Sequence, residues 1–309
     1  MAADATTRVA VFGPHPVLTI TIERRGDADD IHLHAGGQGV WASCIAGRLG
    51  AWPVLCGFAG GETGVVLRTL LAPQPGERRL VSTTTATGCY VVDRRSGERA
   101  LQGVRLSDAP SRHELDDLVS ITCAAALESE LLLVCNPFPA DALPTEAYAT
   151  LVADVRGNGT RVAVDLSSPR LDAALEGRPD IVKINDWELA EYVRDRVDGP
   201  RLRTAGERLL AAGARSVIVT RGPEPALVLT ADRAWEIVPP RFERGSREGC
   251  GDAMMGGLAA GLATGRTWEE ALVLGAGAGA ANFLRHGLGT ATAEVIGDLA
   301  DRVELHALD

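Results

Sequence analysis

The sequence predicts an α/β fold built on a mainly parallel β-sheet with helices on both of its faces. Short apolar runs alternate with helical patterns along most of the 309 residues, and this order produces right-handed βαβ units. The runs carry few polar residues, as expected of strands whose two faces are both covered. Two further stretches alternate apolar and polar residues, which is typical of strands with one face in water. We therefore expect a large covered sheet and a small, half-exposed one.

The covered sheet is expected from apolar strands that are separated by helices. The expected strands are 8–13, 52–58, 131–136, 161–167, 181–185 and 216–222. The expected helices are 39–50, 61–72, 145–157, 186–195 and 206–214, and TWEEALVLGAGAGA (267–280) also has a helical pattern. The last third of the chain is expected to be helical and is rich in Ala and Gly. Because no linker, repeat or low-complexity tract divides the chain, we expect a single domain over 1–309.

The small sheet is expected from residues 18–25, 31–37 and 88–103, with RSGE (95–98) as a turn. We place these strands in a lid that spans approximately 14–36 and 86–106. AGGQG (35–39) follows the first lid segment and is either a flexible turn or a hinge that absorbs the backbone change on closure. Exposed edge strands often pair between subunits, so a homodimer through the lid is a further hypothesis.

Composition excludes several classes of function. A net charge of −10 and 46% hydrophobic residues are typical of a globular protein without non-specific affinity for nucleic acid or anionic membranes. The six cysteines show no metal-binding pattern, and a reducing compartment is the default. Neither a membrane-spanning segment nor a signal-peptide layout is present. We therefore expect a cytoplasmic protein.

The segment Gly249–Asp252 carries the clearest chemical signal. Asp252 follows Gly249-Cys250-Gly251 at the start of a helix of small residues. An aspartate at a helix start is ordinarily a cap, and the motif alone leaves that interpretation open. The glycines instead favour a loop whose N–H groups hold an anion, beside a carboxylate that can take a proton. This combination indicates phosphoryl transfer.

Polar residues also end two of the expected strands. Asn185 and Glu188 follow the strand that holds Lys183, the only lysine in the chain. They are either an N-cap with an acidic first turn or groups that order water around Mg²⁺ on nucleotide phosphates. Thr220-Arg221-Gly222 ends another strand at the same sheet edge, where such folds bind ligands. A P-loop is excluded because GxxxxGK[ST] is absent, and the glycines of 275–283 follow no strand, which disfavours a dinucleotide fingerprint.

Taken in order, these motifs resemble the PfkB/ribokinase family of carbohydrate kinases. The residues that carry the resemblance are Gly36-Gly37, Asn185 to Glu188, Thr220 to Gly222 and Gly249 to Asp252. GFAGGETG (57–64) and the ending GAGAGAANFLRHGLGTAT (275–292) resemble the branch of 1-phosphofructokinase and tagatose-6-phosphate kinase. The resemblance implies a ribokinase-like three-layer α/β/α sandwich with a mainly parallel central sheet and a small β-sheet lid. It also implies ATP with Mg²⁺ as the phosphoryl donor.

The resemblance further implies roles for individual residues. Asp252 would be the catalytic base, and the N–H groups of Gly249, Cys250 and Gly251 would form the anion hole. Asn185 and Glu188 would organise Mg²⁺ through water. The residues expected at the nucleotide are Lys183, Asn185, Glu188, Thr220, Gly222 and Asn282.

The motifs that are expected to bind the acceptor depart from the family's pattern. The aspartate of NPALD is replaced by Thr19, and GGKGIN becomes 36–41, with Gln38 for lysine and Trp41 for asparagine. RTNVK aligns with 86–90, so that uncharged Ala86 and Tyr90 replace its cations. Each lost charge-assisted phosphate contact costs roughly 1.5–3 kcal/mol. The residues expected at the acceptor are Thr19, Gly36, Gly37, Gln38, Trp41, Tyr90, Asn136 and Arg247.

We therefore expect an ATP-dependent kinase that phosphorylates a hydroxyl of a sugar or sugar-like small molecule, with hexose-phosphate kinase ancestry and altered acceptor specificity. One alternative is a genuine 1-phosphofructokinase or tagatose-6-phosphate kinase in which lid arginines replace the lost cations. Another is a non-catalytic sugar or nucleotide sensor. Trp41 is either a packing residue or a flat platform for a ring, and Arg247 either touches a phosphate or pairs with Glu248. The acceptor, the hydroxyl modified and the oligomeric state stay open.

Overall fold

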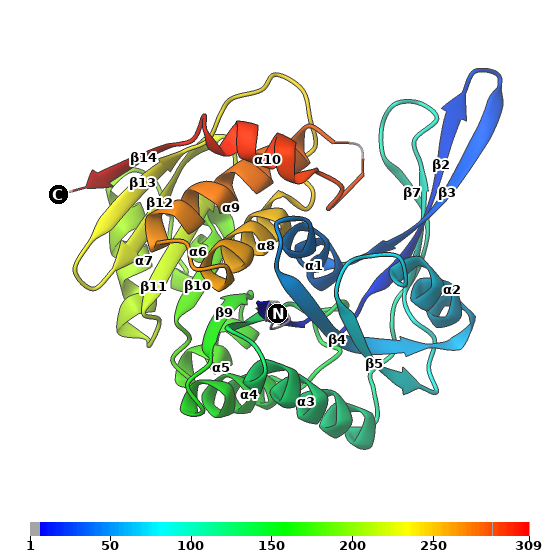
Figure 1. Ribbon diagram of the computed structural model, residues 1–309, viewed down its shortest axis with the longest axis horizontal. Helices are drawn as coiled ribbons and strands as arrows, with labels where there is room; N and C mark the ends of the chain where they lie inside the picture. Colours follow the sequence, from blue (N-terminus) through cyan, green and yellow to red (C-terminus); the bar gives the residue numbers. More distant parts are fainter. Residues whose placement is uncertain (1–6, 286, 309) are drawn as a thin grey trace, which may run out of the picture.

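A computed structural model describes residues 7–285 and 287–308, which form one large and one small β-sheet with ten helices (Figure 1). The strands of the large sheet are β1 (Arg8–Phe12), β4 (Trp52–Gly60), β5 (Glu77–Thr83), β8 (Leu131–Cys135), β9 (Arg161–Asp165), β10 (Ile181–Asn185), β11 (Ser216–Arg221), β12 (Glu224–Thr230), β13 (Ala234–Val238) and β14 (Glu304–Leu308). The helices are α1 (Gln38–Arg48), α2 (Gly61–Leu71), α3 (Arg112–Leu127), α4 (Glu146–Gly157), α5 (Arg170–Glu176), α6 (Asp186–Val193), α7 (Pro200–Ala211), α8 (Cys250–Ala263), α9 (Trp268–Phe283) and α10 (Ala293–Ala300).

The large sheet is mainly parallel, as predicted. Its order is β14-β13-β12-β11-β10-β9-β8-β1-β4-β5, and all pairings from β11 to β5 are parallel. Side chains alternate along each strand. Ala10 and Phe12 of β1 pack in a core with α3 to α7, whereas Val9 and Val11 pack with α1, α2, α8 and α9. The predicted three-layer α/β/α sandwich is therefore confirmed.

The expectation of a helical last third was wrong, because β12, β13 and β14 extend the sheet there in antiparallel pairings. Only Gly222 and Pro223 separate β11 from β12. A connection of that length allows a hairpin, whereas a parallel crossover needs a dozen or more residues. Short apolar runs such as these cannot be distinguished from helix segments by periodicity. The elements β5, α3, α5 and α10 were also not predicted.

The small sheet contains β2 (Val17–Arg25), β3 (Ala28–Gly36), β6 (Cys89–Asp93) and β7 (Ala100–Arg105), in the order β3-β2-β6-β7. The β2–β3 hairpin extends away from the main body, at the upper right of Figure 1. The expected RSGE turn is present, because the N–H of Gly97 donates to the carbonyl of Arg94 at 2.9 Å. Thr19 lies opposite His34 and beside Tyr90 in this sheet, so these three side chains share one face.

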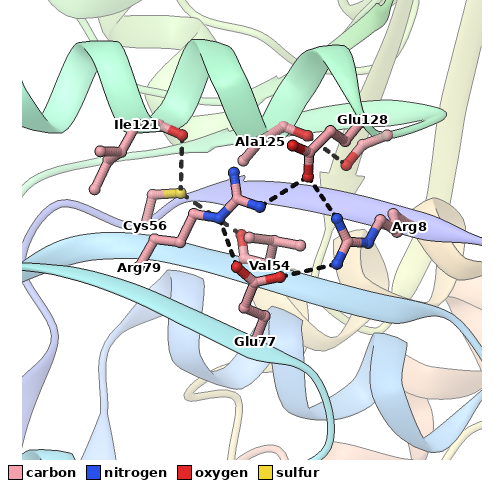
Figure 2. Close-up of polar contacts among 9 residues, drawn as sticks. Arg8, Val54, Cys56, Glu77, Arg79, Ile121, Ala125 and Glu128 are labelled. Atoms are coloured by element: carbon pink, nitrogen blue, oxygen red, sulfur yellow. Dashed lines mark hydrogen bonds and ion pairs between the residues drawn. The ribbon is translucent and has the colours of Figure 1, made fainter.

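Figure 2 shows a network of ion pairs among Arg8, Glu77, Arg79 and Glu128. Arg8 at the start of β1 pairs with Glu77 at the start of β5 at 2.9 Å. Arg79 pairs with Glu77 at 2.6 Å and with Glu128, which follows α3, at 2.8 Å. Since Arg8 also pairs with Glu128, the four side chains join two strands and a helix.

None of the helices in the described ranges is long and apolar enough to cross a membrane.

Candidate active site

The carboxyl ends of four adjacent parallel strands form the edge on which the candidate site is built. Asp165 ends β9 and Asn185 ends β10, while Asn136 directly follows β8. The strand register aligns Lys183 with Asp165 and Asn185 with Thr220. Neighbouring strands thus bring polar groups together that are far apart in the sequence.

Lys183 and Asp165 form a buried ion pair at this edge. The Lys183 ammonium donates to the two carboxylate oxygens of Asp165 at 3.2 and 3.1 Å, and the two residues are only 6% and 4% exposed. Burial lowers the pKa of Lys183, but Asp165, Asp252 and Glu188 outweigh it, so that its pKa lies above the ordinary value. Asp165 was not predicted as a site residue. The sequence did contain a signal for it, because Asp165 is a polar residue at the end of an apolar strand, as Asn185 is.

Asp252 lies in the first turn of α8, beside this pair. It is 8% exposed, and Gly249, with φ +71°, caps the helix without any side-chain cap bond. The interpretation of Asp252 as a cap is therefore wrong. Burial and then the charge of Asp165 raise the pKa of Asp252 to about 7, against the opposing effect of Lys183. A carboxylate with a pKa near neutrality is suited to general-base chemistry.

Gly251 allows the ion pair to lie directly against α8. A β-carbon added at Gly251 would stand 2.5 Å from the Lys183 ammonium, which is closer than any stable contact. Among the described residues, the N–H groups of Gly249 and Gly251 make no hydrogen bond, whereas that of Cys250 donates to the carbonyl of Arg247 at 3.3 Å. Two of the three expected anion-hole donors are thus free.

Asn282 supports the loop that precedes α8. It is fully buried, its amide nitrogen donates to the carbonyl of Glu248 at 2.8 Å, and its amide oxygen accepts from the N–H of Gly289 at 2.9 Å. Asn282 was expected at the nucleotide. Its geometry instead gives it the role of holding the loop and the chain after α9 together.

Asn185 and Glu188 form a complete capping box at the start of α6. The N–H of Glu188 donates to the Asn185 side chain at 2.8 Å, and the N–H of Asn185 donates to the Glu188 carboxylate at 3.1 Å. Burial raises the pKa of Glu188. No group of three or more His, Cys, Asp or Glu side chains within 7–285 and 287–308 could hold a metal ion. A single carboxylate with an amide fits an ion that is held mainly by phosphates and water, as Mg²⁺ is at nucleotide sites.

The Thr220–Gly222 turn lies next to Arg247. Thr220 donates to the carbonyl of Ile184 at 3.5 Å, and Gly222 is exposed with φ +60°. The guanidinium carbon and Nη1 of Arg247 lie 3.8 Å from where a β-carbon on Gly222 would stand. The alternative in which Arg247 pairs with Glu248 is wrong, because Glu248 pairs with Arg99 of the small sheet at 3.2 Å.

One cavity of about 590 Å³ collects the predicted acceptor residues. It is lined by Thr19, Gly36, Gly37, Gln38, Trp41, Tyr90 and Asn136, which come from the small sheet, α1 and the end of β8. Arg247 and Asp252 do not belong to the lining. Glu248, four residues before Asp252, does, so the cavity reaches the loop at the start of α8. The volume is in the ordinary range for small-molecule sites.

The walls of the cavity are aromatic on two sides. The Trp41 ring atom Cζ2 lies 3.3 Å from where a β-carbon on Gly36 would stand, so the indole lies over this glycine. The rings of Tyr90 and Phe138 are 5.4 Å apart and join the small sheet to the loop after β8. Burial raises the pKa of Tyr90 to about 12, which keeps its hydroxyl protonated.

His15 and Gln38 add polar groups to the same cavity. The Gln38 side chain accepts from the N–H of Asn136 at 2.9 Å, which positions Asn136. The His15 Nδ1 is buried without a partner in the described part of the chain, and burial lowers the pKa of His15 to about 4. His15 was not predicted as a site residue, although it occupies the first position of the segment that aligns with NPALD.

Comparison with known proteins identifies the fold and its chemistry. The family described as pfkB family carbohydrate kinase matches residues 17–294. The chain belongs to this family. A 1-phosphofructokinase of Rhodobacter capsulatus is 30% identical over 83% of this chain and 79% of its own length. The ATP-dependent 6-phosphofructokinase isozyme 2 of Escherichia coli is 29% identical, with 82% of each chain covered.

Solved structures agree with this assignment of the kinase. Phosphofructokinase-2 from Escherichia coli in complex with potassium superposes with a TM-score of 0.84 and 25% identity, over 96% of this chain and 99% of that one. The predicted ribokinase-like fold is confirmed. The pfkB-family protein is a phosphotransferase that uses ATP to phosphorylate a hydroxyl group of a sugar. These relatives do not favour the alternative of a non-catalytic sensor.

Proposed function

We propose that this carbohydrate kinase activates its acceptor through Asp252, binds Mg·ATP along the carboxyl edge of β10 and β11, and takes a sugar-like acceptor that carries no phosphate. The observation that carries the proposal is the cavity that unites the predicted acceptor residues while offering few free cations. Each of the three parts rests on separate contacts.

Asp252 is supported as the base by its burial, its neighbours and its place. It has a pKa near 7, and the free N–H groups of Gly249 and Gly251 lie directly before it. A phosphoryl group held by these N–H groups would be within reach of an acceptor hydroxyl that Asp252 deprotonates. Phosphoryl transfer requires little more of the protein than this alignment and the stabilisation of charge.

The nucleotide half is supported by groups at the ends of β10 and β11. Glu188 and Asn185 would hold the water shell of Mg²⁺, which neutralises phosphate charge when bound. Lys183 supplies a buried positive charge at the start of α8. Because Gly222 has no side chain, the nucleotide could approach the backbone closely there.

ATP as co-substrate and the six free cysteines also support the expectation of a reducing, cytoplasmic location.

The proposal of an acceptor without a phosphate is supported by the ion pairs that the arginines of the small sheet form. The lid arginines that could replace the lost cations are Arg24, Arg25, Arg94, Arg95 and Arg105. Four of these five are paired with carboxylates: Arg24 with Asp29, Arg25 with Asp30, Arg95 with Asp93 and Arg105 with Asp108. Arg94 alone of these five lines the cavity. Two further arginines of the lining are engaged, because Arg99 pairs with Glu248 and Arg48 donates to backbone carbonyls.

A phosphate on the acceptor needs several converging charge-assisted bonds. Among the described residues of the lining, Arg94 is the one arginine without a side-chain hydrogen bond or ion pair, and a single guanidinium does not supply them. The indole of Trp41 instead offers an apolar face to a ring, and the neutral imidazole of His15 offers a hydrogen-bonding group. We therefore favour a polyol or glycoside with a flat or apolar portion over a hexose phosphate.

An ATP-consumption screen tests the proposed function. Sugars, nucleosides, cyclitols and aryl glycosides are assayed in pairs, each with its phosphate ester. We expect saturable turnover of an unphosphorylated compound at least tenfold more efficient than that of its ester. Preferential turnover of fructose 1-phosphate or tagatose 6-phosphate would instead support the alternative in which lid arginines replace the lost cations.

A homodimer through the small sheet is proposed as the assembly. Thr19, Thr21 and Glu23 of β2 line the cavity, so the alternate residues Ile20 and Ile22 point to the opposite face. Ile22 lies opposite Ile31, which is 58% exposed. An apolar sheet face with open edges is suited to pairing with a second copy. A relative from Escherichia coli has been solved in a tetrameric form.

A further inference from the structure

We propose that Arg247 is a nucleotide-binding residue that holds a β- or γ-phosphate oxygen of ATP from the side of the β11–β12 turn. The inference rests on the proposed function, since it assumes that the triphosphate approaches the start of α8. It assigns to the nucleotide an arginine that the sequence placed at the acceptor.

The position of Arg247 is defined by contacts at both ends of the residue. Its carbonyl accepts from the N–H of Cys250 at 3.3 Å, which holds its backbone against the first turn of α8. Its guanidinium lies over Gly222, 3.8 Å from where a β-carbon would stand. The side chain thus spans the gap between the start of α8 and the end of β11, on the carboxyl edge of the sheet.

Arg247 is also free to bind a ligand. Its side chain is exposed, and within the described ranges it forms no hydrogen bond or ion pair. The adjacent Glu248 does not compete for it, because Glu248 is paired with Arg99. Lys183, the other cation at the start of α8, is already held by Asp165. A guanidinium without a counter-ion, on a residue two positions before the free N–H of Gly249, suits an anionic ligand.

The ligand is assigned to the nucleotide because of what Arg247 does not touch. It does not line the acceptor cavity, whose nearest lining residue in the chain is Glu248. Gly222, near which the guanidinium lies, follows β11. The neighbouring strand β10 ends at Asn185, and Glu188 lies in the first turn of the next helix, α6. A planar guanidinium can bind two oxygens of one phosphate or bridge two phosphates. Binding should therefore depend on how many phosphates the nucleotide carries.

The test measures nucleotide affinity directly, without an acceptor. Isothermal titration calorimetry of the full-length chain compares Mg·ATP, Mg·ADP and AMP for the wild type, Arg247→Ala, Arg247→Lys and Arg244→Ala. Arg244 is a matched control, because it is an exposed arginine of the same segment. Thermal unfolding of each variant shows whether the fold is kept.

We expect Arg247→Ala to weaken ATP binding about tenfold, which corresponds to about 1.4 kcal/mol, and to leave AMP binding unchanged. ADP binding should weaken to the same extent if Arg247 holds the β-phosphate and stay unchanged if it holds the γ-phosphate. Arg247→Lys should keep part of the affinity because it retains the charge without the fork. Arg244→Ala should match the wild type. In turnover assays, the KM for ATP should rise while the KM for the acceptor stays within twofold.

Unchanged ATP affinity in Arg247→Ala would overturn the assignment, as would an equal loss for AMP or a selective rise in the KM of a phosphorylated acceptor. Failure of the proposed function gives a different result. If the wild type binds Mg·ATP but phosphorylates no compound of the acceptor panel, the acceptor half of the proposal fails, while the calorimetric comparison still decides the role of Arg247. If the wild type binds no nucleotide, both fail.

Discussion

The ammonium of Lys183 lies 3.1 Å from one carboxylate oxygen of Asp165 and 3.2 Å from the other, in the buried interior beneath the first turn of α8. The pair leaves Asp252 as the second carboxylate beside a single ammonium. Burial raises the pKa of Asp252 most, and the charge of Asp165 raises it further, because one ammonium cannot fully compensate two buried carboxylates. This arrangement explains how an aspartate at a helix start has a pKa of about 7.

Asp252→Asn should abolish turnover while the fold is kept. The amide has nearly the same shape but cannot take a proton, so kcat should fall by roughly 10²–10⁴-fold. Mg·ATP binding measured by calorimetry should stay within a few-fold of the wild type and serves as the control. Turnover near the wild-type level would remove Asp252 from the role of base.

The same substitution should change stability in a pH-dependent way. The pKa of Asp252 is raised from an ordinary 3.8 to about 7 in the folded protein, so the folded state holds the proton more tightly than the unfolded chain. Its contribution to the free energy of unfolding therefore falls as the pH rises from about 4 to about 7. Asp252→Asn should raise the Tm relative to the wild type at pH 8 and have a smaller effect at pH 4. Equal shifts at both pH values would contradict a raised pKa.

Asp165 should control the acid limb of the pH–rate profile. The rate should fall as the pH drops through the pKa of Asp252 near 7, because the protonated carboxyl cannot act as a base. Asp165→Asn removes a negative charge that raises this pKa and leaves Lys183 free to favour the Asp252 carboxylate. The limb should therefore move to lower pH. Loss of one partner of a buried pair also costs about 3–5 kcal/mol, which chemical denaturation measures. An acid limb that stays in place would contradict the proposed coupling.

Gly251→Ala should damage the site through a steric clash with Lys183. The added β-carbon would stand 2.5 Å from the ammonium, so the ion pair or the helix must shift. We expect kcat to fall at least about tenfold, given how sharply rates depend on placement at this scale. Gly157→Ala at the end of α4 is the control, because nothing lies within 4 Å of its added β-carbon. Equal activity of the two variants would show that the close contact is not needed.

Substitutions of Trp41 and Arg94 should distinguish an unphosphorylated acceptor from a phosphorylated one. Trp41→Ala removes the proposed platform and should raise the KM for an unphosphorylated acceptor about tenfold or more, with the KM for ATP unchanged. Arg94→Ala should have little effect on that acceptor, as should the control Arg95→Ala, which loses only contacts with Asp93 and Asp29. A large effect of Arg94→Ala on a phosphorylated acceptor would favour the hexose-phosphate alternative.

Ile31→Asp should dissociate the proposed dimer. A carboxylate in an apolar contact between two small sheets would be buried without a partner in the dimer but solvated in the monomer. Light scattering coupled to size-exclusion chromatography should show a dimer for the wild type and a monomer for the variant. Val65→Asp on α2 is a control, since Val65 is exposed to a similar degree outside the small sheet. A wild type that is monomeric at all concentrations would exclude this assembly.

Much of the fold was predictable because its signals are local. The strands 8–13, 131–136 and 181–185 are apolar runs in a chain of alternating helices, and β1, β8 and β10 lie within them. Apart from Arg247, the residues expected at the acceptor line one cavity, and they could be selected because a few short motifs contain Thr19, Gln38 and Trp41. In contrast, β12 to β14 have short runs that fit either structure, and only their pairing with β11 makes them strands.

The site was less predictable where two distant segments meet. Asp165 carries no motif of its own, and its importance follows from the register that aligns it with Lys183 on the next strand. Glu248 and Arg99 lie in two connections that are far apart in the sequence, so no spacing of residues indicates their ion pair. For the same reason the position of the Arg247 side chain near Gly222 could not be deduced from its neighbours in the chain.

By itself, the sequence determined the α/β architecture, the family, the helix whose first turn contains Asp252 and the loss of the family's usual cations at the expected acceptor positions. Only the tertiary structure decided that Asp252 is not a cap, that Lys183 is neutralised by Asp165, and that Arg247 lies over Gly222 instead of in the acceptor cavity. The physical reason is that periodicity and caps depend on residues a few positions apart. Charge compensation and the direction of a long side chain depend on which strands and loops become neighbours on folding.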